Sequence, residues 1–124
     1  HKEYRRQRQM CIRDSFCLQL PGARVDYKWG SNQVFSVAHN KMFAIVDFLG
    51  DNLAFKVDDT LFLGFTDRPG IRPAPYLARA HWISMNGSRP PMGDDELRDL
   101  LTRSHQLVVR RLPKKQQISL LLDL

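Results

Sequence analysis

The chain has 124 residues, of which 43% are hydrophobic and 26% are charged, and its formal net charge is +6. This length allows one domain with a single core, and the apolar fraction excludes an intrinsically disordered chain. No apolar run approaches the ~18 residues of a membrane-spanning helix, so we expect a soluble protein without a membrane partner.

Residues 1–14 differ in character from the rest of the chain and are open to three interpretations. They could form a basic arm that binds phosphates, or a secretory signal, although Arg13 and Asp14 end the apolar run too early for a signal. Back-translated, Arg5 to the start of the Ser15 codon resembles a transposase-based sequencing adapter read in frame, and residues 1–4 fit the bases upstream. We therefore interpret residues 1–14 as a non-native leader and exclude them from fold reasoning.

The leader changes the charge and the cysteine content of the chain. Without residues 1–14, Lys+Arg falls from 19 to 14 and Asp+Glu from 13 to 11, so the net charge falls from +6 to +3. Only Cys17 then remains, which allows no internal disulfide and favours a cytoplasmic location. We expect residues 15–115 to form a single domain and residues 116–124 a C-terminal tail.

The first half of the domain predicts a helix end followed by a meander. Residues 16–20 are typical of a last helical turn stopped by Pro21-Gly22, and residues 23–30 are typical of a connecting loop. Three β-prone runs follow, separated by good turn residues: Val34–Val37, Met42–Phe48 and Leu53–Val57. The third run alternates, so one face of this three-stranded sheet is predicted to be covered and the other to be partly wet.

The second half predicts a short helix, a strand and a long helix. Asp58-Asp59 offers an N-cap for a helix over residues 60–65, and the prolines up to Pro75 allow only edge strand or loop before a strand at 79–85. Three acidic residues from Asp94 onward suit a helix N-terminus. The apolar stripe of this helix is Leu97, Leu100, Leu101, Ser104 and Val108, and Arg110, Arg111 and Pro113 mark its end.

The residues offer little catalytic or metal-binding chemistry. No glycine-rich phosphate loop is present, and the histidines lack metal-ligand spacing. Ser104-His105 cannot form a dyad because helix neighbours point about 100° apart, so we interpret both as solvated. The stretch ARAHWISM brings Arg79, His81 and Trp82 together, either as a platform for nucleic acid or as a buried core tryptophan beside a surface histidine.

Several stretches resemble the MmcQ/YjbR family of small bacterial proteins: CLQLPGARVDYKWGSNQVFSV, KMFAIV, LAFKVDD, RPGIRPAPYLARAHWISM and LRDLLTRSHQLVVRRLPKK. The resemblance runs from Cys17 to about Lys115. It implies an α+β two-layer sandwich of the YjbR-like or CyaY-like type, with the order α-β(3)-α-β(2)-α and helices packed on one side of an antiparallel sheet. It also implies DNA binding through a proposed double-wing motif.

Two function classes stay open, and an enzyme is not expected because no nucleophile, base and orienting group can be assembled. The first is sequence-tolerant DNA binding, in which basic side chains contact phosphates and an aromatic ring stacks on a base. The residues expected to do so are Lys41, Lys56, Arg72, Tyr76, Arg79, His81, Trp82, Lys114 and Lys115. The second is a protein-interaction or chaperone-like module that uses the open sheet face. Neither class calls for a cofactor or a metal.

Overall fold

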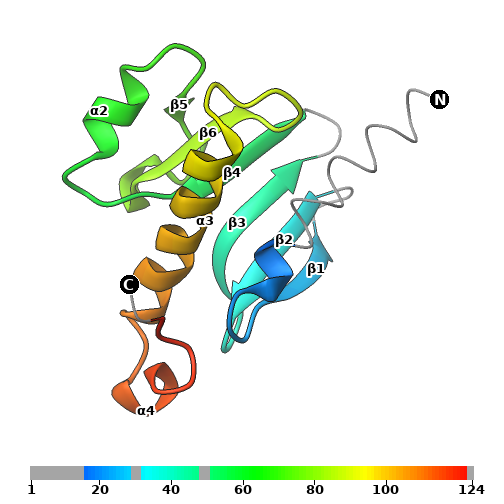
Figure 1. Cartoon of the computed structure of the whole chain (residues 1–124), viewed down its shortest axis with the longest axis vertical. Helices are drawn as coiled ribbons and strands as arrows, with labels where there is room; N and C mark the ends of the chain where they lie inside the picture. Colours follow the sequence, from blue (N-terminus) through cyan, green and yellow to red (C-terminus); the bar gives the residue numbers. More distant parts are fainter. Residues whose placement is uncertain (1–15, 29–31, 48–50, 123–124) are drawn as a thin grey trace.

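The computed structural model describes residues 16–28, 32–47 and 51–122, so the leader interpretation of residues 1–14 lies outside the described residues. The described residues form an α+β fold: an open, antiparallel, six-stranded sheet in the order β1-β2-β3-β4-β6-β5 (Figure 1). The strands are β1 (Arg24–Lys28), β2 (Asn32–Val37), β3 (Lys41–Asp47), β4 (Asn52–Lys56), β5 (Arg72–Pro73) and β6 (Trp82–Asn86).

The predicted meander is confirmed, since β2, β3 and β4 are antiparallel neighbours. The predicted loop at residues 23–30 is wrong, because β1 pairs with β2 from Arg24↔Ser36 to Lys28↔Asn32. The sequence of β1, RVDYK, alternates polar and apolar residues, but none of its side chains is fully buried. An edge strand of this kind gives a weak hydrophobic signal in the sequence. As a result, four strands rather than the expected three precede the first complete helix, α2 (Phe62–Thr66).

The helices are a turn at residues 16–19, α2 (Phe62–Thr66), the 3-10 helix η1 (Ala78–Ala80), α3 (Asp94–Val109) and α4 (Lys114–Gln117). The long helix α3 begins where the acidic residues predicted it. The short helix α2 begins two residues later than expected, and the Asp58-Asp59 cap is wrong: Leu61 occupies the N-cap without a side-chain bond. The Asp59 carboxylate instead pairs with His81 at 2.7 Å.

The strand predicted at residues 79–85 begins later, because Arg79 lies in η1 and His81 adopts a left-handed conformation with φ of 62°. From Trp82 onward the predicted strand is present, with Ile83 and Met85 in the core and with Trp82 and Ser84 on the other face buried as well. The proline-rich stretch before it supplies β5, a two-residue strand that pairs with β6 at the edge of the sheet. Beyond β5, the Ala74 N–H donates to the Trp82 carbonyl at 3.0 Å.

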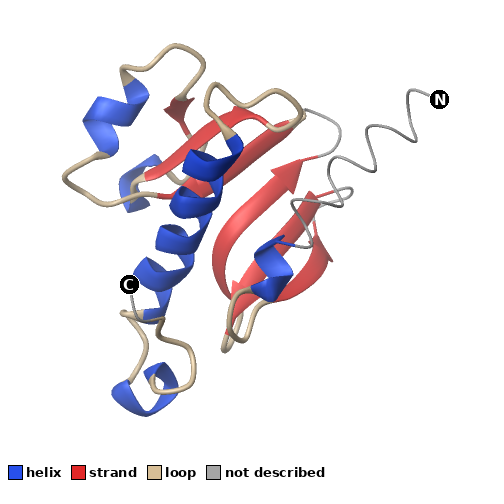
Figure 2. Cartoon of the chain, in the orientation of Figure 1, coloured by secondary structure: helices blue, strands red, loops and turns tan. Residues whose placement is uncertain are grey.

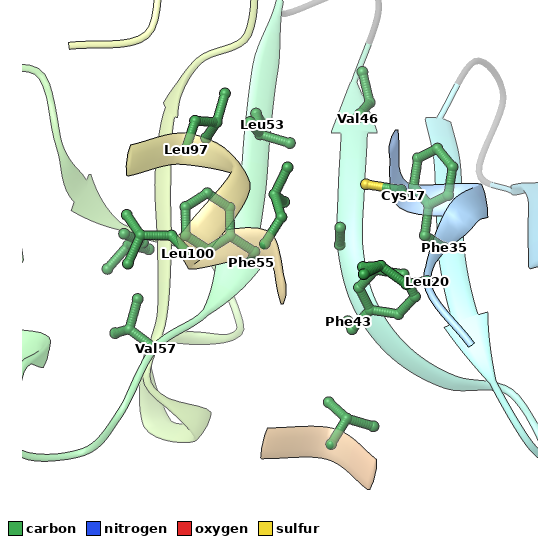
Figure 3. Close-up of a cluster of buried hydrophobic side chains, with 14 of the residues drawn as sticks. Cys17, Leu20, Phe35, Phe43, Val46, Leu53, Phe55, Val57, Leu97 and Leu100 are labelled. Carbon is green, nitrogen blue, oxygen red and sulfur yellow. The ribbon is translucent and has the colours of Figure 1, made fainter. Parts of the chain in front are cut away.

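The core lies between one face of the sheet and α3, which crosses that face (Figure 2). Strands β2 and β3 contribute Phe35 and Phe43, and Phe55 from β4 packs near Leu97 and Leu100 of α3 (Figure 3). The turn at residues 16–19 and the residues after it add Cys17 and Leu20 to the same core. As the resemblance implied, the long helix covers one side of an antiparallel sheet, although the expected order of elements is not matched.

Adjacent side chains of α3 hold together segments from both ends of the domain. His105 is fully buried and donates from Nε2 to the Pro21 carbonyl at 2.7 Å, while its Nδ1 accepts from Gln106 Nε2 at 2.8 Å. Gln106 also donates to the Leu120 carbonyl at 3.0 Å. Leu120 lies over Gly22, where an added Cβ would come within 2.4 Å of Leu120 Cδ2. The chain after α4 is therefore fastened to the body of the domain.

Candidate functional site

Basic side chains meet in a hollow where the sheet, the loop before β6 and the end of α3 come together. We call this the basic hollow. It has a volume of about 250 Å³ and is lined by Lys41, Met42, Lys56, Ala80, Trp82, Val108, Arg111 and Leu112. Every charged side chain among these lining residues is a cation. The hollow therefore has the charge and the size suited to a small anionic group.

The hollow exists because β3 and β4 separate after the pair Ala44↔Phe55. At that point the Ser104 hydroxyl of α3 accepts from the Lys56 N–H at 3.0 Å and donates to the Phe43 carbonyl at 2.6 Å. One side chain thus satisfies a backbone group of each strand across the opening, as buried polar groups require. The sheet parts visibly between the labels β3 and β4 (Figure 1).

Both members of the Ser104-His105 pair are buried, with 0% exposure, so the interpretation of them as solvated residues is wrong. Ser104 joins α3 to two strands, and His105 joins it to the Pro21 turn. Their side chains point to different partners, in agreement with the expectation that they form no dyad. The polar residues of this helix stripe therefore build the fold around the hollow.

Lys56 forms the inner wall of the basic hollow. Its side chain is buried, with only 5% of the residue exposed, and Nζ donates to the Ala80 carbonyl. Burial lowers the pKa of this ammonium group, and repulsion by Arg111 lowers it further, whereas Asp59 raises it. An ammonium group has three donors, so a single carbonyl leaves it able to bind a further acceptor.

A second hollow, of about 280 Å³ between α2 and α3, is also bordered by Lys56 but has a different charge pattern. Its lining includes Asp58 and Asp99 as well as Arg103 and Arg110. Arg103 Nε already pairs with an Asp99 carboxylate oxygen at 3.0 Å. The charges here are largely matched within the protein, which makes this groove a weaker candidate for an anion than the basic hollow.

Arg72 and Tyr76 border a third hollow on the sheet face opposite α3, with a volume of about 520 Å³. Its lining is mostly apolar and includes Ile45, Ala74 and Leu77. Tyr76 is fully exposed and has a left-handed φ of 66°, and Arg72 donates to Asn52 Oδ1 at 2.8 Å. We call this hollow the open-face groove.

The structure brings together only some of the predicted site residues. Lys41, Lys56 and Trp82 share the basic hollow, where Trp82 is 4% exposed and forms wall rather than an open stacking platform. Tyr76 and Arg72 border the open-face groove instead. The remaining predicted residues are Arg79, exposed in η1, His81, paired with Asp59, and Lys114 and Lys115, exposed in α4.

Sequence reasoning missed Arg111, which it treated only as a mark of the helix end. Arg111 lies three residues after the buried Val108 and just past the end of α3, and its exposed side chain borders the hollow. That spacing was the available signal. Arg111 completes the set of three cations around the hollow.

The described part of the chain contains neither a membrane-spanning helix nor a metal site. No helix there is both long and apolar enough to cross a bilayer. Within residues 16–28, 32–47 and 51–122, no group of three or more His, Cys, Asp or Glu side chains could hold a metal ion.

Comparison with known proteins gives a family and related folds. Residues 18–107 match the family model YjbR. A crystal structure of the Deinococcus radiodurans protein DR2400, with a DUF419 domain, is 26% identical, has a TM-score of 0.73 and aligns over 86% of this chain and 83% of its own. A Pseudomonas syringae protein is 25% identical with a TM-score of 0.57, over 69% of this chain and 86% of its own. No functionally curated protein matches the chain.

Proposed function

The chain belongs to the YjbR family, and we propose that this domain binds DNA without strong sequence preference, through DNA phosphates contacted by the basic hollow and by the cations that follow α3. The observation that carries the proposal is the meeting of Lys41, Lys56 and Arg111 around one hollow that no acidic side chain lines. Arginine and lysine next to a water-poor wall are favourable partners for phosphate oxygens.

The charge of the surrounding surface supports the same ligand. Arg110 and Arg111 follow α3, and Lys114 and Lys115 are exposed in α4, only a few residues further along the chain. α4 lies beyond the C-terminal end of α3 in Figure 1. A run of cations of this kind contacts phosphates, which fix position and carry no sequence information.

The proposal is tested by the salt dependence of duplex DNA binding. The logarithm of the association constant should fall linearly with the logarithm of salt concentration, with a slope of about −0.9 for each phosphate neutralised. Replacing Lys114 and Lys115 together with Gln should flatten this slope by up to about two units and leave sequence preference unchanged. An unchanged slope in the double variant would remove α4 from the interface.

Residues 1–14 must be controlled for, because Arg5, Arg6, Arg8 and Arg13 would bind phosphates on their own. The measurement therefore compares the full chain with a chain that starts at Ser15. Salt-dependent binding by both supports the proposal. If only the full chain binds at about micromolar concentration, the leader is responsible and the DNA proposal fails.

The open-face groove favours a second candidate, a protein-interaction module. The groove has a volume of about 520 Å³ and a mostly apolar lining, and Tyr76 at its border is fully exposed. An exposed apolar groove and an exposed aromatic side chain are features of interaction surfaces. This candidate replaces the first if the chain from Ser15 shows no salt-dependent binding to DNA. In that case, Tyr76→Ala should weaken the protein contact, whereas the Lys114 and Lys115 replacements should leave it unchanged.

A further inference from the structure

We propose that the basic hollow is a receptor for a phosphate monoester, the doubly charged group found at the end of a nucleic-acid strand or on a free nucleotide. The inference deepens the proposed function and rests on it for the strand as the source of the phosphate. The phosphate chemistry itself can be tested without DNA. Three features of the hollow lead to a terminal phosphate rather than one within a strand.

The first feature is the depth of Lys56. This residue is 5% exposed and lies at the inner wall, so a ligand must enter the hollow to reach Nζ. A phosphate inside a strand carries a nucleoside on both sides, and both would have to leave through the mouth of a hollow of about 250 Å³. A terminal phosphate has one ester link and can enter with its three free oxygens first.

The second feature is the charge. Lys41, Lys56 and Arg111 supply three cations, and the acidic residue that acts on Lys56, Asp59, does not line the hollow and already pairs with His81. A phosphate monoester carries a charge of about −1.5 to −2 at pH 7, whereas a phosphodiester carries a single charge. The excess of positive charge is therefore better matched by the monoester.

The third feature is the fixed frame. The Ser104 hydroxyl bridges the Phe43 carbonyl and the Lys56 N–H and fixes the positions of the two strands, so contacts within the protein hold the hollow open. The Ala80 carbonyl holds Lys56 Nζ in place, and Trp82, Val108 and Leu112 form apolar walls. A preformed site with fixed donors loses little entropy on binding, and apolar walls strengthen its charge interactions.

The test uses the full chain and a single-stranded oligonucleotide of about ten nucleotides, within the usual site size of such proteins. Its 5′-phosphorylated form is compared by fluorescence anisotropy with a slightly longer 5′-hydroxyl strand of matched total charge. We expect the 5′-phosphorylated strand to bind about tenfold more tightly or better, because hydrogen bonds to charged groups are strong. Inorganic phosphate, at constant ionic strength set with chloride, should raise the melting temperature.

Variants assign the effect to the hollow. Arg111→Gln alters an exposed residue at the rim and should abolish most of the 5′-phosphate preference and of the thermal shift. Lys56→Met should also abolish most of the 5′-phosphate preference and of the thermal shift, and circular dichroism first checks that this variant is folded. Lys28→Gln is the matched control, because Lys28 lies in β1 at the far edge of the sheet and does not line the hollow. It should leave both signals intact.

The outcomes separate this inference from the proposed function. Equal binding of the two strands, or a preference that survives Arg111→Gln, overturns the terminal-phosphate site and leaves general DNA binding standing. A phosphate-induced thermal shift that Arg111→Gln removes, without binding of either strand, supports the site with a free phosphate or nucleotide as its ligand and counts against DNA. If neither strand binds and phosphate causes no thermal shift, both proposals are overturned.

Discussion

At the scale of single residues, His105 makes stability depend on pH. Burial lowers the pKa of its imidazole from 6.5, while the hydrogen bond to the Pro21 carbonyl raises it by a smaller amount. The Gln106 amide also donates to Nδ1, so the folded protein accommodates the neutral ring with its proton on Nε2. Protonation of Nδ1 would place its N–H group opposite the Gln106 Nε2 donor, and this site has no exposure to solvent.

We therefore expect the domain to lose stability as the pH falls below about 6.5, where the unfolded chain binds a proton that the folded chain resists. Above that pH both states are neutral at this position and the effect vanishes. Between the unfolded and the folded pKa, each pH unit costs about 1.4 kcal/mol. Urea unfolding at a pH just above neutrality and at one near 5.5 measures the loss.

Two variants identify the group that titrates. His105→Gln should be less stable than the parent at neutral pH but should show a flatter pH dependence, whereas His39→Gln changes an exposed side chain and should keep the parental slope. Glu96 does not interfere, since the hydrogen bond from Arg68 lowers the pKa of that carboxyl below its ordinary 4.5. A parental slope in His105→Gln would assign the effect elsewhere.

At the scale of elements, the packing of α3 on the sheet should dominate stability. Leu101 is 1% exposed in the same core as Phe55 and Val57. Leu101→Ala should cost about 2 to 5 kcal/mol, because it removes a buried side chain and leaves a cavity. Leu63→Ala in α2 is the control, since Leu63 is 78% exposed and its loss should change the free energy of unfolding little. Similar losses in both variants would contradict the proposed packing.

Sequence reasoning found the elements whose own residues carry the signal. Strands β2 and β3 contain β-branched and aromatic side chains, and β4 alternates Leu53 and Phe55 with less apolar residues. Helix α3 combines acidic residues at its start with an apolar stripe. It missed β1, which alternates but holds only two apolar residues, Val25 and Tyr27, because its side chains stay partly exposed at the sheet edge. It also missed the left-handed turn at His81, which delays the start of β6.

The site was harder to predict because tertiary contacts create it. The basic residues were visible in the sequence, but the hollow depends on Ser104 reaching the Phe43 carbonyl, 61 residues away along the chain. A serine in a helix stripe gives no hint of such a partner. Arg111 borders the hollow at its rim, near the point where β3 and β4 cease to pair. Local pattern therefore predicted the kinds of residue involved but not which of them meet.

At the scale of the whole molecule, the core should remain folded when residues 1–14 are deleted. Cys17 and Leu20 already anchor the start of the described chain in the core. Deleting residues 1–14 should therefore shift the melting temperature by only a few degrees, roughly the effect of 1 kcal/mol or less. Circular dichroism on both chains gives the comparison. A much larger loss would mean that Met10 and Ile12 contribute buried side chains.

The short edge strand β5 affects whether copies of the molecule can associate through the edges of their sheets. Its flanking Ala74 N–H points inward to the Trp82 carbonyl, so by alternation the nitrogen of Pro73 faces outward, where it has no hydrogen to offer. A fibre that grows by strand addition needs a receptive edge on both sides of every subunit. With an imino acid at this edge, strand addition there is disfavoured, so we expect association through the sheet to use the β1 edge and to stop at a pair.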